Sequence, residues 1–138
     1  MAYWLLKTEP DSWSWAQQKK AGAKGEPWTG VRNPGARVHM KAMKKGDLAF
    51  FYHTGDEKAV VGVVKVTREP YPDPADEAWP LVDVAAVEDF PKAVTLASVK
   101  ADPKLGEMVL VKNARLSVQP VSAAEWKSVR KMGGFKDK

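Results

Sequence analysis

Runs of apolar and β-branched residues, separated by polar and proline-rich breaks, predict five strands in this chain of 138 residues. The predicted strands cover residues 3–7, 48–53, 60–67, 81–90 and 116–120. Between the third and the fourth, residues 69–74 read Glu-Pro-Tyr-Pro-Asp-Pro. Three prolines in five residues favour an extended, stiff loop at this position. The residues from 22 to 30 are also expected to form a loop.

Capping patterns place short helices between these strands. Ser14 followed by Gln17 is a capping box, which predicts a helix over residues 15–21 that ends at Gly22. Asn33 and Pro34 suit the N-cap and first position of a second helix, over residues 34–43. Two later helices are predicted over 95–100 and from the capping box at 122–125 to the glycines at 133–134. Residues 105–111 are compatible with either a helix or a strand.

Strands with short helices between them, and no long crossover helix, indicate an α+β fold built on a small mixed barrel rather than on a parallel sheet. At 138 residues, with 44% hydrophobic and 28% charged residues, the composition is that of one globular domain, residues 1–138. The short apolar run at the N-terminus has no signal-peptide pattern, and no stretch approaches a membrane span. We therefore expect a cytoplasmic monomer without membrane contact.

The charge distribution favours an anionic partner. The formal net charge is +5 and the sequence pI is about 9.4, which lies in the range typical of nucleic-acid-binding domains. Residues 19–45 contain eight cationic residues and a single acid, Glu26. Because this basic segment surrounds Trp28 and Asn33, a stacking aromatic side chain and a helix N-terminus lie among the cations. The alternative for Trp28 is an ordinary position in the core.

The sequence offers no set of residues for catalysis. It has no cysteine and two histidines, which argues against a structural zinc site, and it lacks the glycine-rich phosphate-binding motifs and the nucleophile-elbow motif. We therefore expect a binding protein without cofactor or metal. Among the six tryptophans, Trp4 and Trp126 are predicted to lie in the core, whereas Trp13, Trp15 and Trp28 are candidates for either ligand stacking or packing.

Several motifs, in order along nearly the whole chain, resemble the EVE domain family. They read YWLLKTEPDS from residue 3, WTGVRNPGAR from residue 28, MKKGDL from residue 43, FYHT from residue 51 and VQPVS from residue 118. Three positions depart from the expected pattern: Trp13 stands in place of Tyr, Thr54 in place of Ser, and Val38 in place of Asn. The last substitution removes a polar group near the start of the second helix, which changes ligand contacts there rather than the fold.

The resemblance implies a PUA-like pseudo-barrel of five to six mostly antiparallel strands with short helices around it, related to YTH domains. It also implies a non-catalytic reader of a modified base, such as methylated or oxidised cytosine, which is flipped into an aromatic pocket of the protein. The alternatives are an RNA-binding module without selectivity for modification and a protein that binds a small nucleotide or metabolite. The ligand-binding residues that the resemblance implies are Lys7, Ser12, Trp13, Trp28, Gly30, Val31, Arg32, Asn33, Tyr52, His53 and Thr54.

Overall fold

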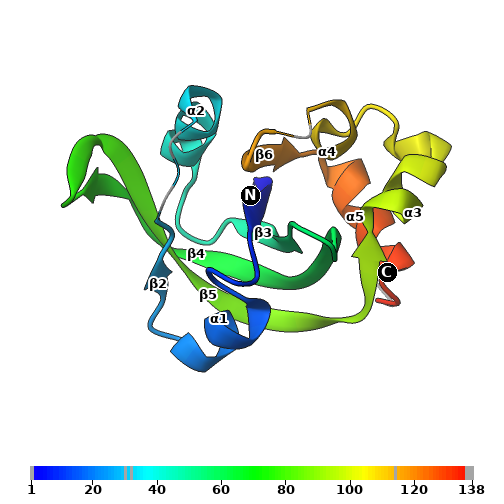
Figure 1. Ribbon diagram of the computed structural model, residues 1–138, viewed down its shortest axis with the longest axis horizontal. Helices are drawn as coiled ribbons and strands as arrows, with labels where there is room; N and C mark the ends of the chain where they lie inside the picture. Colours follow the sequence, from blue (N-terminus) through cyan, green and yellow to red (C-terminus); the bar gives the residue numbers. More distant parts are fainter. Residues whose placement is uncertain (1, 30, 32, 114, 136–138) are drawn as a thin grey trace.

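The strands form a single sheet in the computed structural model, which describes residues 2–29, 31, 33–113 and 115–135. Within these residues the order across the sheet is β2-β5-β4-β3-β1-β6 (Figure 1). The strands are β1 (Tyr3–Thr8), β2 (Glu26–Pro27), β3 (Leu48–His53), β4 (Ala59–Asp73), β5 (Asp76–Thr95) and β6 (Val118–Val121). The helices are α1 (Trp15–Ala21), α2 (Pro34–Ala42), α3 (Leu96–Ala101), α4 (Val109–Lys112) and α5 (Ala123–Met132), with a 3₁₀ turn, η1 (Pro103–Leu105), between α3 and α4.

The pairing of the strands confirms the predicted α+β fold of mostly antiparallel strands. β1 and β3 are parallel, whereas every other pair of neighbours in the described sheet is antiparallel. The sheet begins with β2 and ends with β6, so it is curved but not closed into a barrel. Several register shifts between β4 and β5 bend these two long strands, because each extra residue in a strand increases its local twist.

Both faces of the sheet are covered by apolar clusters, which explains the continuous apolar run of β3. Side chains alternate between the faces of a strand. Phe51 therefore joins the cluster that includes Met40 of α2, whereas Phe50 joins the cluster that includes Trp126 of α5. Trp126 stacks on Phe50 with ring centroids 3.9 Å apart, and Trp4 is also buried, so both tryptophans lie in the core as predicted.

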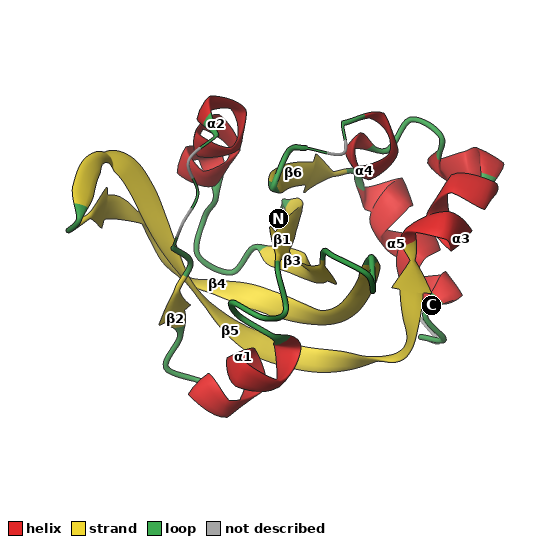
Figure 2. Ribbon diagram, viewed as in Figure 1, coloured by secondary structure: helices red, strands yellow, loops and turns green. Residues whose placement is uncertain are grey.

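The helices begin where the capping patterns predict. Ser14 and Ser122 each form a complete capping box, and Asn33 and Thr95 cap α2 and α3 with their side chains. Figure 2 shows α3, α4 and α5 gathered at one end of the molecule, with α1 and α2 on opposite sides of the other end. Within the described residues, no helix is long and apolar enough to cross a membrane.

Two segments predicted as loops form strands. The proline-rich segment of residues 69–74 lies largely within β4, which continues to Asp73 and pairs with β5 in a hairpin at the edge of the molecule. Pro72 lies opposite Pro80, and neither has an N–H group to donate, so the missing donors fall in the same cross-strand pair. The segment between α1 and α2 contains β2, whose two residues pair with Asp83 and Val84 of β5.

The hairpin contains Tyr71, whose hydroxyl should make the free energy of unfolding depend on pH in the alkaline range. Burial, together with a hydrogen bond of 2.5 Å from the Tyr71 hydroxyl to Asp83 Oδ1, raises the pKa of Tyr71 to about 12. Because this pKa lies above its ordinary value of 10.0, the contribution to stability is complete below pH 10 and is lost as the pH rises towards about 12.

We therefore expect the free energy of unfolding to fall more steeply between pH 10 and 12 in the native protein than in Tyr71→Phe. Urea denaturation at a series of pH values measures this difference. Lysine deprotonation affects both proteins alike, so equal slopes would show that Tyr71 makes no contribution in this range.

Candidate ligand-binding site

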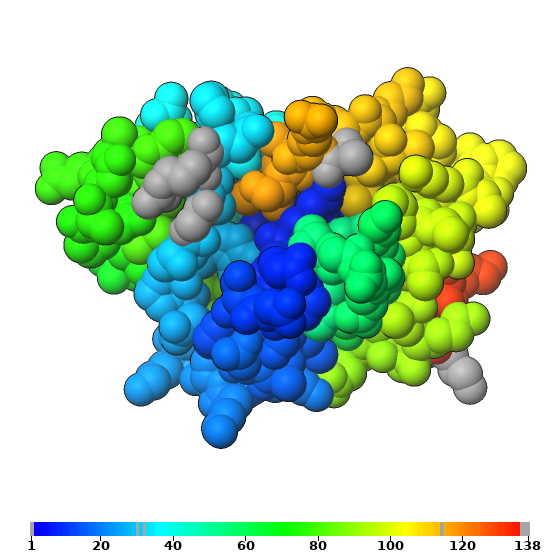
Figure 3. Space-filling model, in the orientation of Figure 1, coloured from blue at the N-terminus to red at the C-terminus, as the bar shows by residue number. Residues whose placement is uncertain are grey.

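A cavity of about 340 Å³ opens at the end of β1. It lies between the first loop, which we define as residues 9–14, and the segment that contains β2. Figure 3 shows the surface hollowed between the dark-blue first loop and the light-blue residues that follow α1. The volume is within the usual range of small-ligand sites, roughly 300–1,000 Å³. The described residues that line the cavity are Lys7, Thr8, Ser12, Trp13, Glu26, Pro27, Trp28 and Thr29.

The first wall of the cavity is the first loop, which is held in place by hydrogen bonds at both ends. The Thr8 hydroxyl donates to the backbone oxygen of Trp13 at 2.9 Å, and the Trp13 amide donates to the backbone oxygen of Glu9 at 3.0 Å. The indole Nε1 of Trp13 donates to Gln18 Oε1 at 2.9 Å, and Gln18 Nε2 donates to the backbone oxygen of Val84 at 3.1 Å. Gln18 is fully buried, and these two hydrogen bonds connect the half-buried Trp13 ring to β5.

The second wall is β2 with Trp28. The Trp28 amide donates to the backbone oxygen of Val82 at 2.8 Å, which continues the pairing between β2 and β5. The Trp28 ring meets the Phe51 ring edge to face, with centroids 5.5 Å apart, and the side chain is only 5% exposed. Trp28 therefore lines the cavity and also belongs to the core, whereas its role in stacking on a ligand stays a prediction.

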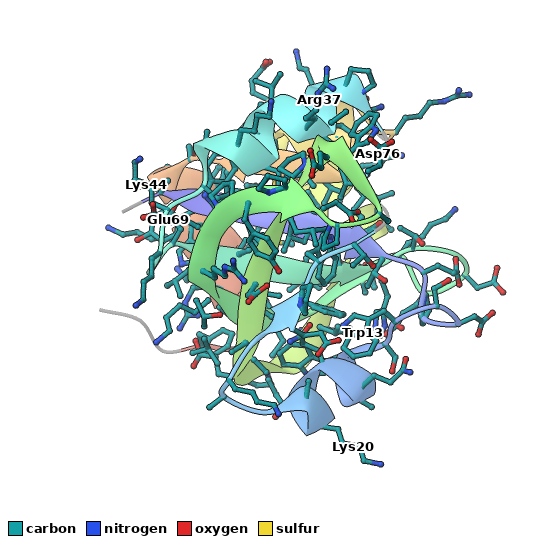
Figure 4. All side chains as sticks on the ribbon, turned by 90° about the vertical axis from the view of Figure 1, so that its left-hand side faces the viewer. Trp13, Lys20, Arg37, Lys44, Glu69 and Asp76 are labelled. Atoms are coloured by element: carbon teal, nitrogen blue, oxygen red, sulfur yellow. The ribbon has the colours of Figure 1, made fainter. Side chains whose placement is uncertain are left out.

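The charges around the cavity are of both signs: Lys7 and Glu26 line it, and the first loop carries Glu9 and Asp11. Burial lowers the pKa of the Lys7 ammonium, whose Nζ lies 5.7 Å from the centroid of the Tyr52 ring, and burial also raises the pKa of Tyr52. Glu26 contributes a carboxylate to the lining. Figure 4 shows Trp13 between α1, from which Lys20 points away, and α2, which carries Arg37 on the opposite side of the molecule.

His53 and Thr54 support the first loop rather than line the cavity. His53 Nε2 accepts a hydrogen bond of 3.0 Å from the backbone amide of Trp15, so its proton lies on Nδ1, 2.6 Å from Glu57 Oε1. A helix leaves its first amides without backbone partners, and His53 satisfies one of them in α1. The Thr54 amide donates to the backbone oxygen of Thr8 at 2.9 Å. Tyr52 likewise lies in the core on the far side of β3 from Phe51.

Other predicted residues lie beside the cavity or outside the described part of the chain. Asn33 is exposed, and its Oδ1 accepts hydrogen bonds of 2.8 and 3.1 Å from two amides of α2, which confirms its role as the N-cap. Val31 is buried in the core cluster of Phe51. Neither is among the lining residues. Gly30 and Arg32 lie outside the described residues, so their predicted roles stay predictions.

The structure brings together four of the predicted residues, Lys7, Ser12, Trp13 and Trp28, and adds four that the sequence did not suggest. The additional lining residues are Thr8, Glu26, Pro27 and Thr29. Thr8 and Thr29 belong to the quoted motifs, directly after Lys7 and Trp28, whereas Glu26 and Pro27 form the short β2. Glu26 had a visible signal, because it is the single acid within the basic segment 19–45.

The comparisons with known proteins decide the family. The sequence profile of the EVE domain matches residues 2–132. The chain belongs to the EVE domain family. Among its relatives, the thymocyte nuclear protein 1 of Gallus gallus is 33% identical over 90% of this chain, and that of Homo sapiens is 32% identical over 91%. The chain spans 65% of the length of the chicken protein and 71% of the human one.

Several solved structures have the same architecture. A protein from Agrobacterium tumefaciens matches with a TM-score of 0.96 and 50% identity, over 100% of this chain and 97% of its own. The human THYN1 protein in complex with DNA that contains 5-methylcytosine matches with a TM-score of 0.89 and 30% identity, over 99% of this chain and 100% of its own. A YTH domain from Zygosaccharomyces rouxii, at 16% identity and a TM-score of 0.59 over 99% of this chain and 87% of its own, shares the fold.

Gln18 bridges Trp13 and Val84 by two hydrogen bonds, so we expect its replacement to destabilise the protein and to expose the Trp13 indole N–H to solvent exchange. In Gln18→Met, the Trp13 indole N–H and the Val84 carbonyl lose their partner, so the free energy of unfolding should fall by about 1–3 kcal/mol. The Trp13 indole proton should also exchange faster with solvent, as NMR of the indole N–H signals would record. Gln17→Met is the matched control, because Gln17 is exposed and makes one capping bond, to the Ser14 amide. A Gln18→Met protein with unchanged stability and unchanged Trp13 exchange would contradict the bridge.

Proposed function

We propose that this protein binds nucleic acid that carries a modified base, and that it encloses a single flipped base, a modified cytosine, in the cavity between the first loop and β2. The observation that supports this most directly is the pair of tryptophans, Trp13 and Trp28, that line one cavity together with a lysine. The human THYN1 protein, which shares the fold at 30% identity, has been solved with DNA containing 5-methylcytosine.

The size and the chemistry of the cavity suit a base. Flat aromatic side chains stack on nucleobases, and each stacked base contributes about 1–3 kcal/mol. Extruding a base from a duplex costs a few kcal/mol, which stacking and contacts to the base edge recover. A small domain of this kind encloses one nucleotide rather than reading a long sequence. The hydroxyls of Thr8, Ser12 and Thr29, together with Lys7, supply hydrogen-bonding groups around the aromatic walls.

The charge around the cavity suits a nucleic-acid backbone. Lys20 is exposed on α1, and Arg37 on α2 lies 4.8 Å from the centroid of the Trp79 ring. Both cations belong to the basic segment 19–45, which also contains β2 and Trp28 of the cavity wall, so the phosphates of a strand that places one base in the cavity lie near positive charge. Such contacts are independent of sequence, and increasing salt weakens them through the release of counterions. The protein acts as a binding module without a catalytic step.

The test compares oligonucleotides that differ in one methyl group. Fluorescence anisotropy with labelled DNA should show tighter binding when the central cytosine carries a 5-methyl group, by about 10- to 100-fold, because one methyl group in an apolar corner contributes about 1–3 kcal/mol. Trp13→Ala should weaken binding of the methylated DNA about tenfold or more through the loss of stacking. Trp13 is a better choice than Trp28 for this test, because Trp28 also supports the core.

Trp79→Ala is the matched control. Trp79 is a half-buried tryptophan outside the cavity lining, and its ring lies against Arg37, so any loss of affinity in Trp79→Ala should be equal for the methylated and the unmethylated DNA. Increasing salt should weaken methylated and unmethylated DNA alike. Equal affinity for the two oligonucleotides would contradict a reader function and favour binding of unmodified RNA. Equal affinity for the free nucleoside and for the oligonucleotide would favour a small-molecule site.

A further inference from the structure

Glu26 is the carboxylate among the described residues that line the cavity, and it has no evident structural task. Its side chain makes no hydrogen bond or ion pair with any described residue, although the backbone around it is paired in the sheet. The residue is half-buried beside the two tryptophans that line the cavity. A carboxylate in this setting gains from any ligand that donates a hydrogen bond to it.

The backbone fixes where this carboxylate lies. Glu26 pairs with Val84 of β5, and it follows Gly25, which has a φ of +87°. A Cβ atom on Gly25 would lie 2.4 Å from Thr67 Oγ1, so the chain comes close to β4 immediately before Glu26. The backbone that carries the Glu26 side chain is therefore paired with β5, and the residue before it lies close to β4.

An ionised carboxylate accepts hydrogen bonds and donates none. Cytosine presents its amino group N4 as a donor, whereas thymine and uracil present the carbonyl oxygen O4 at the same position of the ring. A carboxylate that faces this edge binds the amino group and repels the carbonyl. A carboxylate also repels phosphate, so its presence in a cavity for nucleic acid directs its role to the base rather than to the backbone.

We propose that Glu26 determines the specificity of the cavity by accepting a hydrogen bond from the exocyclic amino group of the enclosed base. Cytosine and 5-methylcytosine are then accepted, whereas thymine, which has the same 5-methyl group, is rejected. This inference rests on the proposed function, and it adds the residue that distinguishes 5-methylcytosine from thymine, which carry the same methyl group.

The experiment uses four DNA duplexes that are identical except for one base placed opposite an abasic site, so that no base pair has to be broken. The four bases are 5-methylcytosine, cytosine, thymine and uracil. Together they vary the methyl group and the amino group independently. In the native protein we expect the amino bases to bind at least about tenfold more tightly than the matching carbonyl bases. In Glu26→Gln this ratio should fall below about threefold, because an amide can accept from an amino group or donate to a carbonyl.

The methyl preference in the same data separates this inference from the proposed function. Glu26→Gln should keep the ratio of 5-methylcytosine to cytosine that the native protein shows. Glu107→Gln is the control for the lost charge, because Glu107 is exposed and pairs with Lys112 at 2.8 Å, outside the cavity lining. It should leave both ratios unchanged.

Two results would overturn the inference alone. One is an unchanged ratio of amino to carbonyl bases in Glu26→Gln, and the other is a native protein that prefers the methyl group but binds 5-methylcytosine and thymine equally. A native protein without a methyl preference, or without binding to any of the four duplexes, would overturn the proposed function as well. Thermal unfolding of each variant confirms that the binding data come from folded protein.

Discussion

The contacts of Phe51 hold the two walls of the cavity together. Trp15 of α1 packs on this ring from one side, with centroids 5.0 Å apart, and Trp28 packs on it edge to face at 5.5 Å. Trp15 reaches this position because β4 has Gly62 beneath it, where a Cβ atom would lie 2.2 Å from the Trp15 ring. Aromatic packing of this kind carries much of the energy of a core. The aromatic cluster therefore contacts Trp28 of the second wall and Trp15, which directly follows the first loop.

Polar contacts add to this aromatic packing by connecting α1 to the sheet. Trp15 Nε1 donates to Asp89 Oδ1 at 2.7 Å, and Lys19 pairs with the same carboxylate at 2.8 Å, so α1 is tied to β5. These hydrogen bonds from Lys19 and Trp15 lower the pKa of Asp89. His53 adds a bond from β3 to the first turn of α1. For the proposed binding of a base, walls that are held by such contacts lower the conformational entropy lost on binding.

The starts of the helices could be predicted from the sequence, because a helix cap depends on residues within four positions of one another. Ser14 with Gln17 and Asn33 with Pro34 gave the starts of α1 and α2 correctly. The β2 strand could not be predicted, because it exists through pairing with Asp83 and Val84 of β5, which lie far away in the sequence. The far half of β4 pairs with nearby residues of β5 in a hairpin, but its own residue pattern does not show this pairing. The prolines of β4 favour a loop on their own, and they are accepted here because Pro72 faces Pro80.

For the candidate site, too, the residues within motifs could be predicted, whereas contacts between distant residues could not. The resemblance to the EVE domain family suggested Trp13, Trp28 and Lys7, which line the cavity. It also suggested His53 as a ligand contact, which stays a prediction, and the structure shows that this side chain accepts a hydrogen bond from a residue 38 positions away, the amide of Trp15. Such a role depends on how β3 and α1 meet, which no local pattern records. Glu26 was visible in the sequence as an isolated acid, but its place in the lining depends on the pairing of β2.

The most direct measurement of the central claim is an isotope-filtered NOE experiment on the labelled protein with an unlabelled oligonucleotide that contains one 5-methylcytosine. If the base is enclosed between the first loop and β2, the protons of its 5-methyl group will show NOEs to the ring protons of Trp13 and Trp28. NOEs from that methyl group to the neighbouring bases of the oligonucleotide, with none to either tryptophan, would mean that the base stays stacked in the DNA and that the cavity does not hold it.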